Sequence, residues 1–391
     1  MTGDAGQRLL DAVRDYAPKI AARGQEIETA RRLPRDLVED LRALGLFRMM
    51  VPKSHGGLEV DFDYNLKICS ALSAADGSTG WTATFGGGSC MFLSLLPRAT
   101  FDEIYADGPD VIVAGALPPN GTAEIVDGGY RVSGRWGFVS GAHHADYINT
   151  NCVVTKNGVP VPGPAPGVPL LRAFMLPAAN YEIIDTWHAA GMKGSGSPDV
   201  ALHDAFAPES RAFDLIGGEP CVQGPYFFGQ FTLHAFHFAA MAAGIAQGAL
   251  DDLTAIALAG KSRALARQRM ADSELFQDAL GRAEADLKAA LALLESESLW
   301  CWREAHNGPL RRATTVRVLQ SVVWIIDASV RVVDACHTAA GGGSIYESAP
   351  LQRRLRDIHV LTQHALLRKQ AYADSGAARL GHAPTIPFGR D

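Results

Sequence analysis

Apolar residues recur at helical spacing through the first quarter of the chain. Between Gln7 and Leu95 they recur mostly at intervals of three and four, which places them on one face of a helix. Examples are Leu9, Val13, Ile20, Leu37, Leu41 and Leu44. Pro34 suits a helix start and Gly45 a helix end, because glycine accepts the left-handed conformation that follows a last turn. We therefore predict an N-terminal α-helical domain over residues 1–112.

The pattern changes near Val111. From there to Ala212, short runs of Val, Ile, Tyr and Phe are broken by glycine and proline clusters. Asp127-Gly128-Gly129 and Asn157-Gly158 are typical of tight turns between strands. This pattern predicts a β-domain over residues 113–215.

Helical spacing returns at Gln230 and continues over long stretches rich in Ala and Leu. The apolar positions include Phe276, Leu280, Ala283, Leu287, Leu291, Val318, Val322 and Ile325. We predict a C-terminal helical bundle over residues 216–391. No Gly-x-Gly-x-x-Gly motif follows a strand and opens a helix, so a Rossmann nucleotide site is disfavoured. The chain is thus expected to be α+β, in the order helices, sheet, helices.

Composition and charge exclude several kinds of partner. The 391 residues carry 36 Lys and Arg against 42 Asp and Glu, a net charge of −6. This balance predicts no extended basic surface for nucleic acid or for an anionic membrane. Residues 1–14 mix charged and apolar side chains, so we expect no signal peptide, no membrane span and a cytoplasmic protein. The cysteines are scattered without a Cys-x-x-Cys pair, which favours neither disulfides nor a metal site.

The segment Gly129–Gly141 carries candidate cofactor chemistry. In a strand, Trp136, Phe138 and Ser140 would share one face, because alternate side chains point the same way. Two aromatic rings beside a hydroxyl could form a wall for a planar ring with a hydrogen-bonding edge, such as a flavin. Taken alone, the segment could equally be a core strand with both rings packed inward.

A second glycine-rich segment, Gly191–Ser197, lies in the same β-domain. Free backbone N–H groups, the hydroxyls of Ser195 and Ser197 and the Lys193 cation could hold a phosphate or polarise a flavin edge. The alternative is an ordinary flexible loop.

Paired histidines near the C-terminus are candidates for proton transfer. His359 and His364 follow a glycine turn that begins at Gly341. Five positions on one helix separate two side chains by about 140°, so at most one of them is expected to be catalytic. A lone helical histidine is also commonly structural.

Two further histidine pairs have plainer explanations. His234 and His237 have a spacing that can serve a metal, but no carboxylate completes the set, and a packed helix face explains them better. His143 and His144 follow the flavin-candidate strand, and at most one of the two can point inward from a strand.

Taken together and in order, these segments resemble the acyl-CoA dehydrogenase superfamily over nearly the whole chain. Within it, Ser133–Gly141 and the Arg356–His364 region look more like the two-component, reduced-flavin-dependent monooxygenases of group D, which are phenol-hydroxylase-like. Other matching segments are Leu44–Phe47, Val51-Pro52, His55–Gly57, Asp76–Trp81, Gly191-Met192, Gly244–Gly248 and Pro350–Asp357. The resemblance implies a middle antiparallel β-barrel, a C-terminal four-helix bundle and a homotetramer.

The resemblance also implies a reaction and roles for particular residues. Such enzymes take reduced FMN, or FAD in its place, from a separate NAD(P)H:flavin reductase and capture O2 as a flavin C4a-hydroperoxide. They then hydroxylate a small molecule, which is expected here to be an aromatic or polycyclic biosynthetic compound. Ser140 would hold flavin N5 and His364, or else His359, would steady the peroxide. Further flavin contacts would be Trp136, Phe138, Met192, Lys193, Gly194, Ser195 and Ser197. The substrate pocket would include Trp81, Phe85, Ser89, His143 and His237.

Departures from a dehydrogenase favour the monooxygenase over its alternative, an acyl-CoA dehydrogenase-like FAD oxidoreductase. The usual catalytic carboxylate is replaced by Ser348, with Glu347 one position off, and Phe227–Gln247 contains no Glu. Lys261–Met270 lacks the usual Arg and Phe-Gly anchor for FAD. Thr84–Cys90 offers small residues where phenol hydroxylases often have a histidine. This difference either leaves room for a larger fused-ring substrate or suits oxidation at nitrogen or sulfur. The third hypothesis for this sequence is a helical scaffold protein that binds no flavin.

Overall fold

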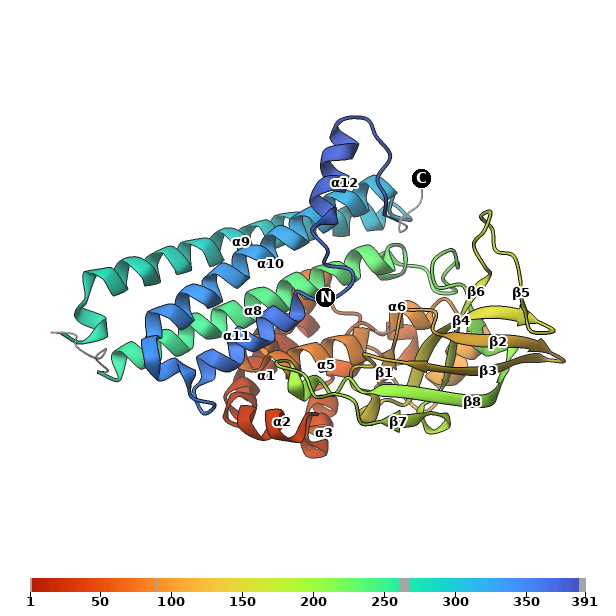
Figure 1. Ribbon diagram of the computed structural model, residues 1–391, viewed down its shortest axis with the longest axis horizontal. Coiled ribbons are helices and arrows are strands. Elements are labelled where there is room, and N and C mark those ends of the chain that lie inside the picture. The colour runs from red at the N-terminus through yellow and green to blue at the C-terminus, as the bar shows by residue number, and fades with distance from the viewer. Residues whose placement is uncertain (1, 89, 261–267, 387–391) are drawn as a thin grey trace.

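The computed structural model describes residues 2–88, 90–260 and 268–386, which form helices, then a sheet, then helices again (Figure 1). The first group of helices consists of α1 (Thr2–Ala22), α2 (Gly24–Ala30), α3 (Arg35–Leu44), α4 (Phe62–Ala75), α5 (Gly77–Gly88), α6 (Cys90–Leu93) and α7 (Arg98–Ile104). Helix α3 begins after Pro34 and ends before Gly45, whose φ of 95° needs a glycine-like left-handed backbone. Leu37 and Leu41 are fully buried, as the helical spacing predicts.

Helix α5 is rich in glycine and threonine, and it lies between the other helices and the sheet (Figure 1). Asp76 caps its first turn, because its Oδ1 accepts hydrogen bonds from the Thr79 N–H (2.8 Å) and hydroxyl (2.9 Å). A side chain at Gly87 would lie 2.6 Å from the Leu46 carbonyl oxygen, so this close approach requires glycine. The cap and the close packing hold α5 firmly where it faces the sheet.

The middle of the chain forms one mixed sheet. Its strands are β1 (Val113–Gly115), β2 (Gly121–Val126), β3 (Gly129–Trp136), β4 (Tyr147–Lys156), β5 (Val159–Pro160), β6 (Leu171–Pro177), β7 (Glu182–Ile184), β8 (Asp199–Pro208) and β9 (Ala212–Phe213). The order is β7-β8-β3-β2-β4-β6-β9, with β1 and β5 also paired to β4. Strands β1 and β2 run parallel to β4, while the other pairs are antiparallel.

The predicted closed antiparallel barrel is therefore wrong. Within the described residues, the end strands β7 and β9 do not pair with each other, so the sheet stays open. The parallel pairing arises because the chain leaves β3 and crosses over β2 before it enters β4. Local turn signals predict neighbouring strands, but they do not reveal a crossover of this kind. The same crossover, residues 137–146, contains Phe138 and Ser140.

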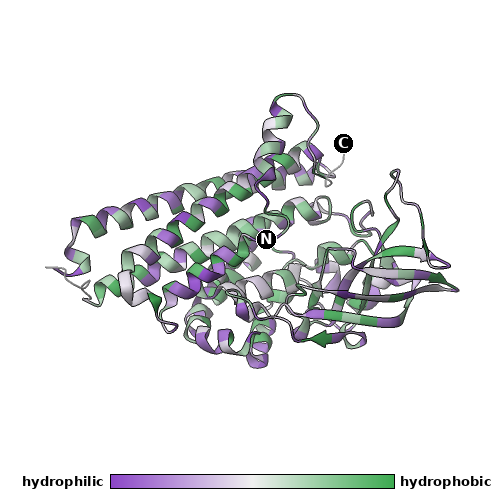
Figure 2. Ribbon diagram, in the orientation of Figure 1, coloured by the Kyte–Doolittle hydropathy of each residue, from purple (hydrophilic) through white to green (hydrophobic). Residues whose placement is uncertain are grey.

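The C-terminal part consists of α8 (Gln230–Leu258), α9 (Glu274–His306), α10 (Arg312–Ala340), α11 (Pro350–Leu361) and α12 (Gln370–Arg379). Helix α8 packs against α9, α10, α11 and the N-terminal helix α4, and it is buried almost all round. Figure 2 shows the corresponding contrast between the largely hydrophobic α8 and the mixed surface of α9. No helix in the described ranges is long and apolar enough to cross a membrane.

Two hydrophobic cores result from this arrangement. The larger core joins the N-terminal and C-terminal helices, while the sheet has a core of its own that includes Val132, Trp136, Ile148 and Phe174. A site built between the helices and the sheet therefore has a rigid body on each side.

Candidate functional site

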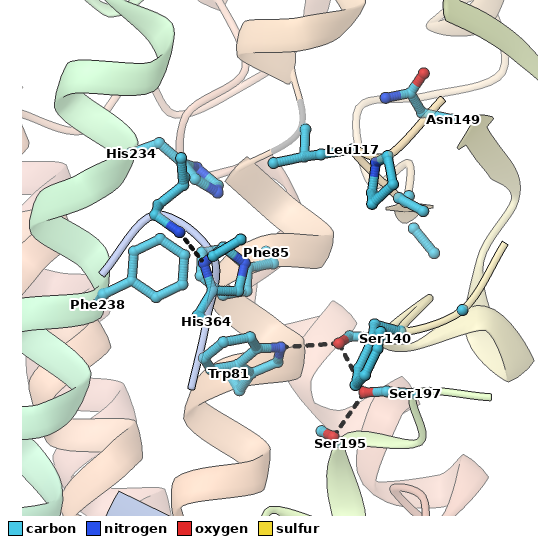
Figure 3. Close-up of a pocket in the computed structure, with 18 of the residues that line it drawn as sticks. Trp81, Phe85, Leu117, Ser140, Asn149, Ser195, Ser197, His234, Phe238 and His364 are labelled. Carbon is cyan, nitrogen blue, oxygen red and sulfur yellow. Dashed lines mark hydrogen bonds between the residues drawn. The ribbon is translucent and has the colours of Figure 1, made fainter. Parts of the chain in front are cut away.

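A cavity of about 410 Å³ lies between the sheet and the helices. Its walls come from α5, the segment 113–118, the β3–β4 crossover, the Gly191–Ser197 loop, α8 and residues 360–366 that end and follow α11. The close-up in Figure 3 shows serines on one side and aromatic rings on the other. Segments far apart in the sequence thus meet at one cavity.

One wall of the cavity carries a chain of hydroxyl groups. Trp81 Nε1 donates to Ser140 Oγ at 3.0 Å, and Ser140 Oγ lies 2.7 Å from Ser197 Oγ (Figure 3). Ser197 Oγ in turn lies 2.8 Å from Ser195 Oγ. The Gly141 N–H binds the carbonyl oxygen of Ser195 at 3.0 Å, which holds the crossover against the glycine-rich loop. Because Ser140 accepts from Trp81, its own proton can be offered to Ser197 or to a group in the cavity.

The strand that carries the aromatic pattern ends earlier than predicted. Strand β3 stops at Trp136, and Phe138 has a left-handed φ of 62°, so the two rings do not share a face with Ser140. Trp136 is fully buried in the sheet's own core and donates from Nε1 to the Asn151 carbonyl oxygen at 2.8 Å. The prediction that Trp136 flanks a flavin is therefore wrong.

Phe138 does line the cavity, and it is highly exposed for an aromatic side chain. It is 77% exposed, and its ring contacts Trp187 edge-on at a centroid distance of 6.1 Å. Trp187 also lines the cavity, although no residue spacing in the sequence indicated it. Two aromatic rings thus stand at this side of the cavity with free faces.

The glycine-rich loop divides into residues that reach the cavity and residues that hold the loop. Met192, Ser195 and Ser197 line the cavity. Lys193 instead lies with its Nζ 3.2 Å from Glu28 Oε1, and Gly194 packs where an added side chain would strike Ile27. Lys193 and Gly194 therefore do not line the cavity, because they pack against α2, and their flavin contacts stay a prediction.

A buried carboxylate supports the same loop from α11. Asp357 Oδ1 accepts the Met192 N–H at 2.5 Å, and Met192 has a left-handed φ of 49°. Burial, with a further contribution from Asp76, raises the pKa of Asp357 to about 7. Asp357 holds the loop conformation without itself lining the cavity.

The two C-terminal histidines have different surroundings. His364 lines the cavity just beyond the end of α11, with its ring 4.4 Å from Phe238 between centroids, and its Nδ1 accepts the Leu366 N–H at 3.3 Å. Burial lowers the pKa of His364 to about 4, so the imidazole is neutral at pH 7. His359 lies on α11 outside the cavity, half exposed, with Nε2 2.9 Å from Asp334 Oδ1. His359 therefore lies too far outside the cavity to act on a group bound in it. The catalytic role of His364 stays a prediction.

The residues predicted for the substrate pocket divide in the same way. Trp81 and Phe85 line the cavity, and Ser89 lies outside the described residues. His143 is exposed on a short 3₁₀ turn and does not line the cavity. His237 is fully buried and points toward α4, where its Nε2 lies 2.6 Å from Asn65 Oδ1. The pocket predictions for His143 and His237 are therefore wrong.

His234, rather than His237, faces the cavity from α8. Phe231, His234 and Phe238 all line it, and their spacing of three and four residues places them on one face of the helix. Burial lowers the pKa of His234 well below its ordinary value, and nearby His237 adds to the effect. The sequence held this signal in the spacing of the two aromatic residues around His234.

Asn149 on β4 and Gln363 beyond the end of α11 are polar lining residues that were not predicted for the site. Asn149 lies on the side opposite His234 in the view of Figure 3. In the described part of the chain, no Asp, Glu, Lys or Arg lines the cavity. The segment Lys261–Met270, which lacks the usual FAD anchor in the sequence, falls largely on residues 261–267, outside the described ranges.

Comparisons with known proteins agree with this architecture. Family models match the acyl-CoA dehydrogenase N-terminal domain over residues 4–99 and the C-terminal domain over residues 236–369. The chain is 32% identical over 385 residues to the indole-3-acetate monooxygenase of Pseudomonas putida, across 98% of this chain and 95% of the relative. It is 28% identical to the flavin-dependent monooxygenase oxygenase subunit HsaA of Mycobacterium tuberculosis, across 97% and 96% of the two chains. The solved structure of XiaF from Streptomyces sp. with FADH2 and glycerol matches with a TM-score of 0.91 and 28% identity, over 99% and 98%.

Proposed function

Because this chain belongs to the acyl-CoA dehydrogenase family, among its flavin-dependent monooxygenases, we propose that it is the oxygenase component of a two-component system. It takes reduced FMN or FAD from a separate NAD(P)H:flavin reductase and hydroxylates an aromatic small molecule with O2. The observation that carries this proposal is the fixed hydroxyl of Ser140 and the neutral imidazole of His364 at one cavity that no described carboxylate lines.

The residues at the serine wall fit a flavin. Ser140, Ser195 and Ser197 supply hydroxyls for the polar edge of a planar ring, and Phe138 and Trp187 supply aromatic faces beside them. A reduced flavin bound there supplies the electrons that activate O2 for transfer of one oxygen atom. The chain's own contribution is to orient the ring and to keep water away from it.

The residues across from the serines manage protons and exclude water. His364 is held between Phe238 and Trp81, and its neutral ring can accept a proton from a bound group, while its pKa of about 4 favours the return of that proton at pH 7. Phe85 and Phe92 complete an apolar surround in which competing hydrolysis and proton leakage are suppressed. Ser140 acts as the fixed hydrogen-bond partner of the cofactor's polar edge.

The dehydrogenase alternative lacks its base. Removal of a proton from the carbon beside a thioester needs a carboxylate in the cavity. Glu347 and Ser348 are exposed, and neither is among the residues that line the cavity. Asp357 is buried, but it is engaged with the Met192 N–H behind the cavity wall.

We further infer a homotetramer built through the C-terminal helices. Helices α8, α9, α10 and α11 pack on one another in the manner of a four-helix bundle. Large apolar side chains remain exposed on three of them, namely Leu258 on α8, Leu275 and Leu299 on α9 and Trp324 on α10. Association of copies would cover this surface, and light scattering of the purified protein tests the assembly.

The decisive experiment supplies a flavin reductase, NADH and either FMN or FAD, then screens aromatic compounds by mass spectrometry. We expect a product heavier by one oxygen atom, with the label incorporated from ¹⁸O2 and not from water. Reductase with flavin alone, in the presence of catalase, is the control for free peroxide. Tightly bound FAD together with acyl-CoA oxidation, and no oxygen incorporation, would contradict the proposal.

A further inference from the structure

The half of the cavity away from the serines has no charged side chain. Phe85, Phe92, Phe231 and Phe238 supply its rings, and the described lining residues include no Lys, Arg, Asp or Glu. The histidines on this side, His234 and His364, are neutral because of burial. A carboxylate placed there would lose its hydration without gaining a counter-ion, which is strongly unfavourable.

His234 lines the cavity, and one nitrogen of its imidazole has no hydrogen-bond partner. Its Nδ1 is buried and unpaired, while its ring lies 4.7 Å from Phe85 and 5.4 Å from Phe92 between centroids. A neutral imidazole has one N–H donor and one acceptor nitrogen, so it can bind a hydroxyl, an N–H or a carbonyl group. The flanking rings make the space beside it suitable for a flat molecule.

Asn149 presents a second unpaired group from β4. Its side chain is only 7% exposed, it lines the cavity, and its Oδ1 has no hydrogen-bond partner. Buried amide oxygens are seldom left unpaired, since this costs the full desolvation of the group. His234 and Asn149 come from opposite sides of the cavity, from α8 and from the sheet (Figure 3).

We propose that His234 and Asn149 bind the two polar ends of an uncharged, planar aromatic substrate, and that this cavity discriminates against aromatic carboxylates. The proposal rests on the oxygenase function given above and names its substrate class. It separates this chain from the relative named for indole-3-acetate, whose carboxylate is ionised at neutral pH.

A matched pair of probes tests the charge preference. Indole-3-ethanol and indole-3-acetate share the ring and the side-chain length, and they differ in whether the far end is a hydroxyl or a carboxylate. With reduced FMN bound and O2 excluded, we expect indole-3-ethanol to bind at least tenfold more tightly by isothermal titration. With O2 and the reductase system, it should also show the higher kcat/KM.

Two variants test the named residues. His234→Leu and Asn149→Leu should each weaken the binding of indole-3-ethanol by about tenfold, the factor for one lost hydrogen bond near 1.4 kcal/mol. Because His234 Nδ1 and Asn149 Oδ1 have no hydrogen-bond partner to lose, the melting temperature of each variant should stay level or rise. His359→Leu, outside the cavity, is the control and should leave binding unchanged.

Tighter or equal binding of indole-3-acetate, or lowered melting temperatures with unchanged binding in both variants, would overturn the inference. Failure of the oxygenase function has a different signature, because neither compound would gain oxygen. The anaerobic affinities would still be measurable in that case and would still decide the charge preference.

Discussion

The serine wall of the cavity differs from the rest of the lining in how completely its polar groups are paired. On the serine wall, Ser140, Ser195 and Ser197 each have a hydroxyl partner within 3.0 Å, and Trp81 adds a donor. On the walls away from it, His234 on α8 and Asn149 on β4 carry buried polar atoms with no partner. The serine wall is thus paired within the protein, whereas we propose that a bound substrate pairs with His234 and Asn149.

From this difference we infer that the serine wall holds the cofactor, which is the constant component of the reaction. A paired network locks its side chains in one geometry and suits a cofactor that is the same in every turnover. Unpaired polar groups among aromatic rings suit a substrate. Leaving them unpaired costs free energy until the polar groups of a correctly fitting substrate bind them. The following predictions test this division, from the largest expected effect to the smallest.

Replacing His364 should have the largest effect. His364→Ala is expected to slow product formation by about 100-fold, within the range that a positioned acid–base group contributes. Stopped-flow measurement of product formation with reduced FMN and O2 checks it. His359→Ala is the matched control and should stay within about twofold, because its side chain pairs with Asp334 at the surface. The reverse order would show that the cavity histidine is not the working one.

Acid should lower the free energy of unfolding through the histidines buried on α8 beside the cavity. The pKa of His237 is lowered to about 4 by burial, so the unfolded chain, with a pKa near 6.5, binds more protons between these values. The stabilisation is complete above pH 6.5 and is lost as pH falls toward 4, by about 2 kcal/mol between pH 7 and 5. Urea denaturation of the wild type and His237→Gln at both pH values measures it.

The raised pKa of Asp357 acts with the opposite sign, but it is common to both proteins and cancels in that comparison. The variant should therefore lose less stability on acidification than the wild type does. An identical loss in the two proteins would mean that His237 does not titrate as its burial indicates.

Removing the Ser140 hydroxyl should uncouple oxygen use from product. Ser140→Ala is expected to lower the product formed per O2 consumed by about tenfold, as a lost hydrogen bond worth ~1.4 kcal/mol implies. Peroxide and product assays with an oxygen electrode measure this ratio. Ser210→Ala, on an exposed turn, is the control. Unchanged coupling in Ser140→Ala would remove the cofactor role assigned to the serine wall.

The exposed ring of Phe138 should have the smallest effect. Phe138→Leu is expected to weaken reduced FMN binding by about threefold, because one aromatic contact contributes ~0.5–1.5 kcal/mol beyond its area. Anaerobic fluorescence titration measures the Kd. Phe206→Leu serves as the control, since Phe206 is also exposed but stands beside Arg131 on the sheet. Equal affinities for both variants would place the flavin elsewhere on this wall.

The sequence indicated some of the residues that line the cavity and misplaced others. Ser140 and His364 could be identified because glycine-flanked and C-terminal motifs carry them, and both line the cavity. Trp136 could not be judged correctly, since strand alternation fails where Phe138 turns left-handed after Gly137. Lys193 does not line the cavity, because its ion partner Glu28 lies on a distant helix.

Periodicity and turn residues by themselves determined the kinds of element, their order and the absence of a Rossmann motif. They did so because hydrophobic spacing and glycine conformations act over a few residues. Only the tertiary structure decided that the sheet is open and mixed, and that His234 faces the cavity while His237, about 60° around the same helix, faces Asn65. Such choices depend on which neighbour each face packs against, and those neighbours lie far away in the chain.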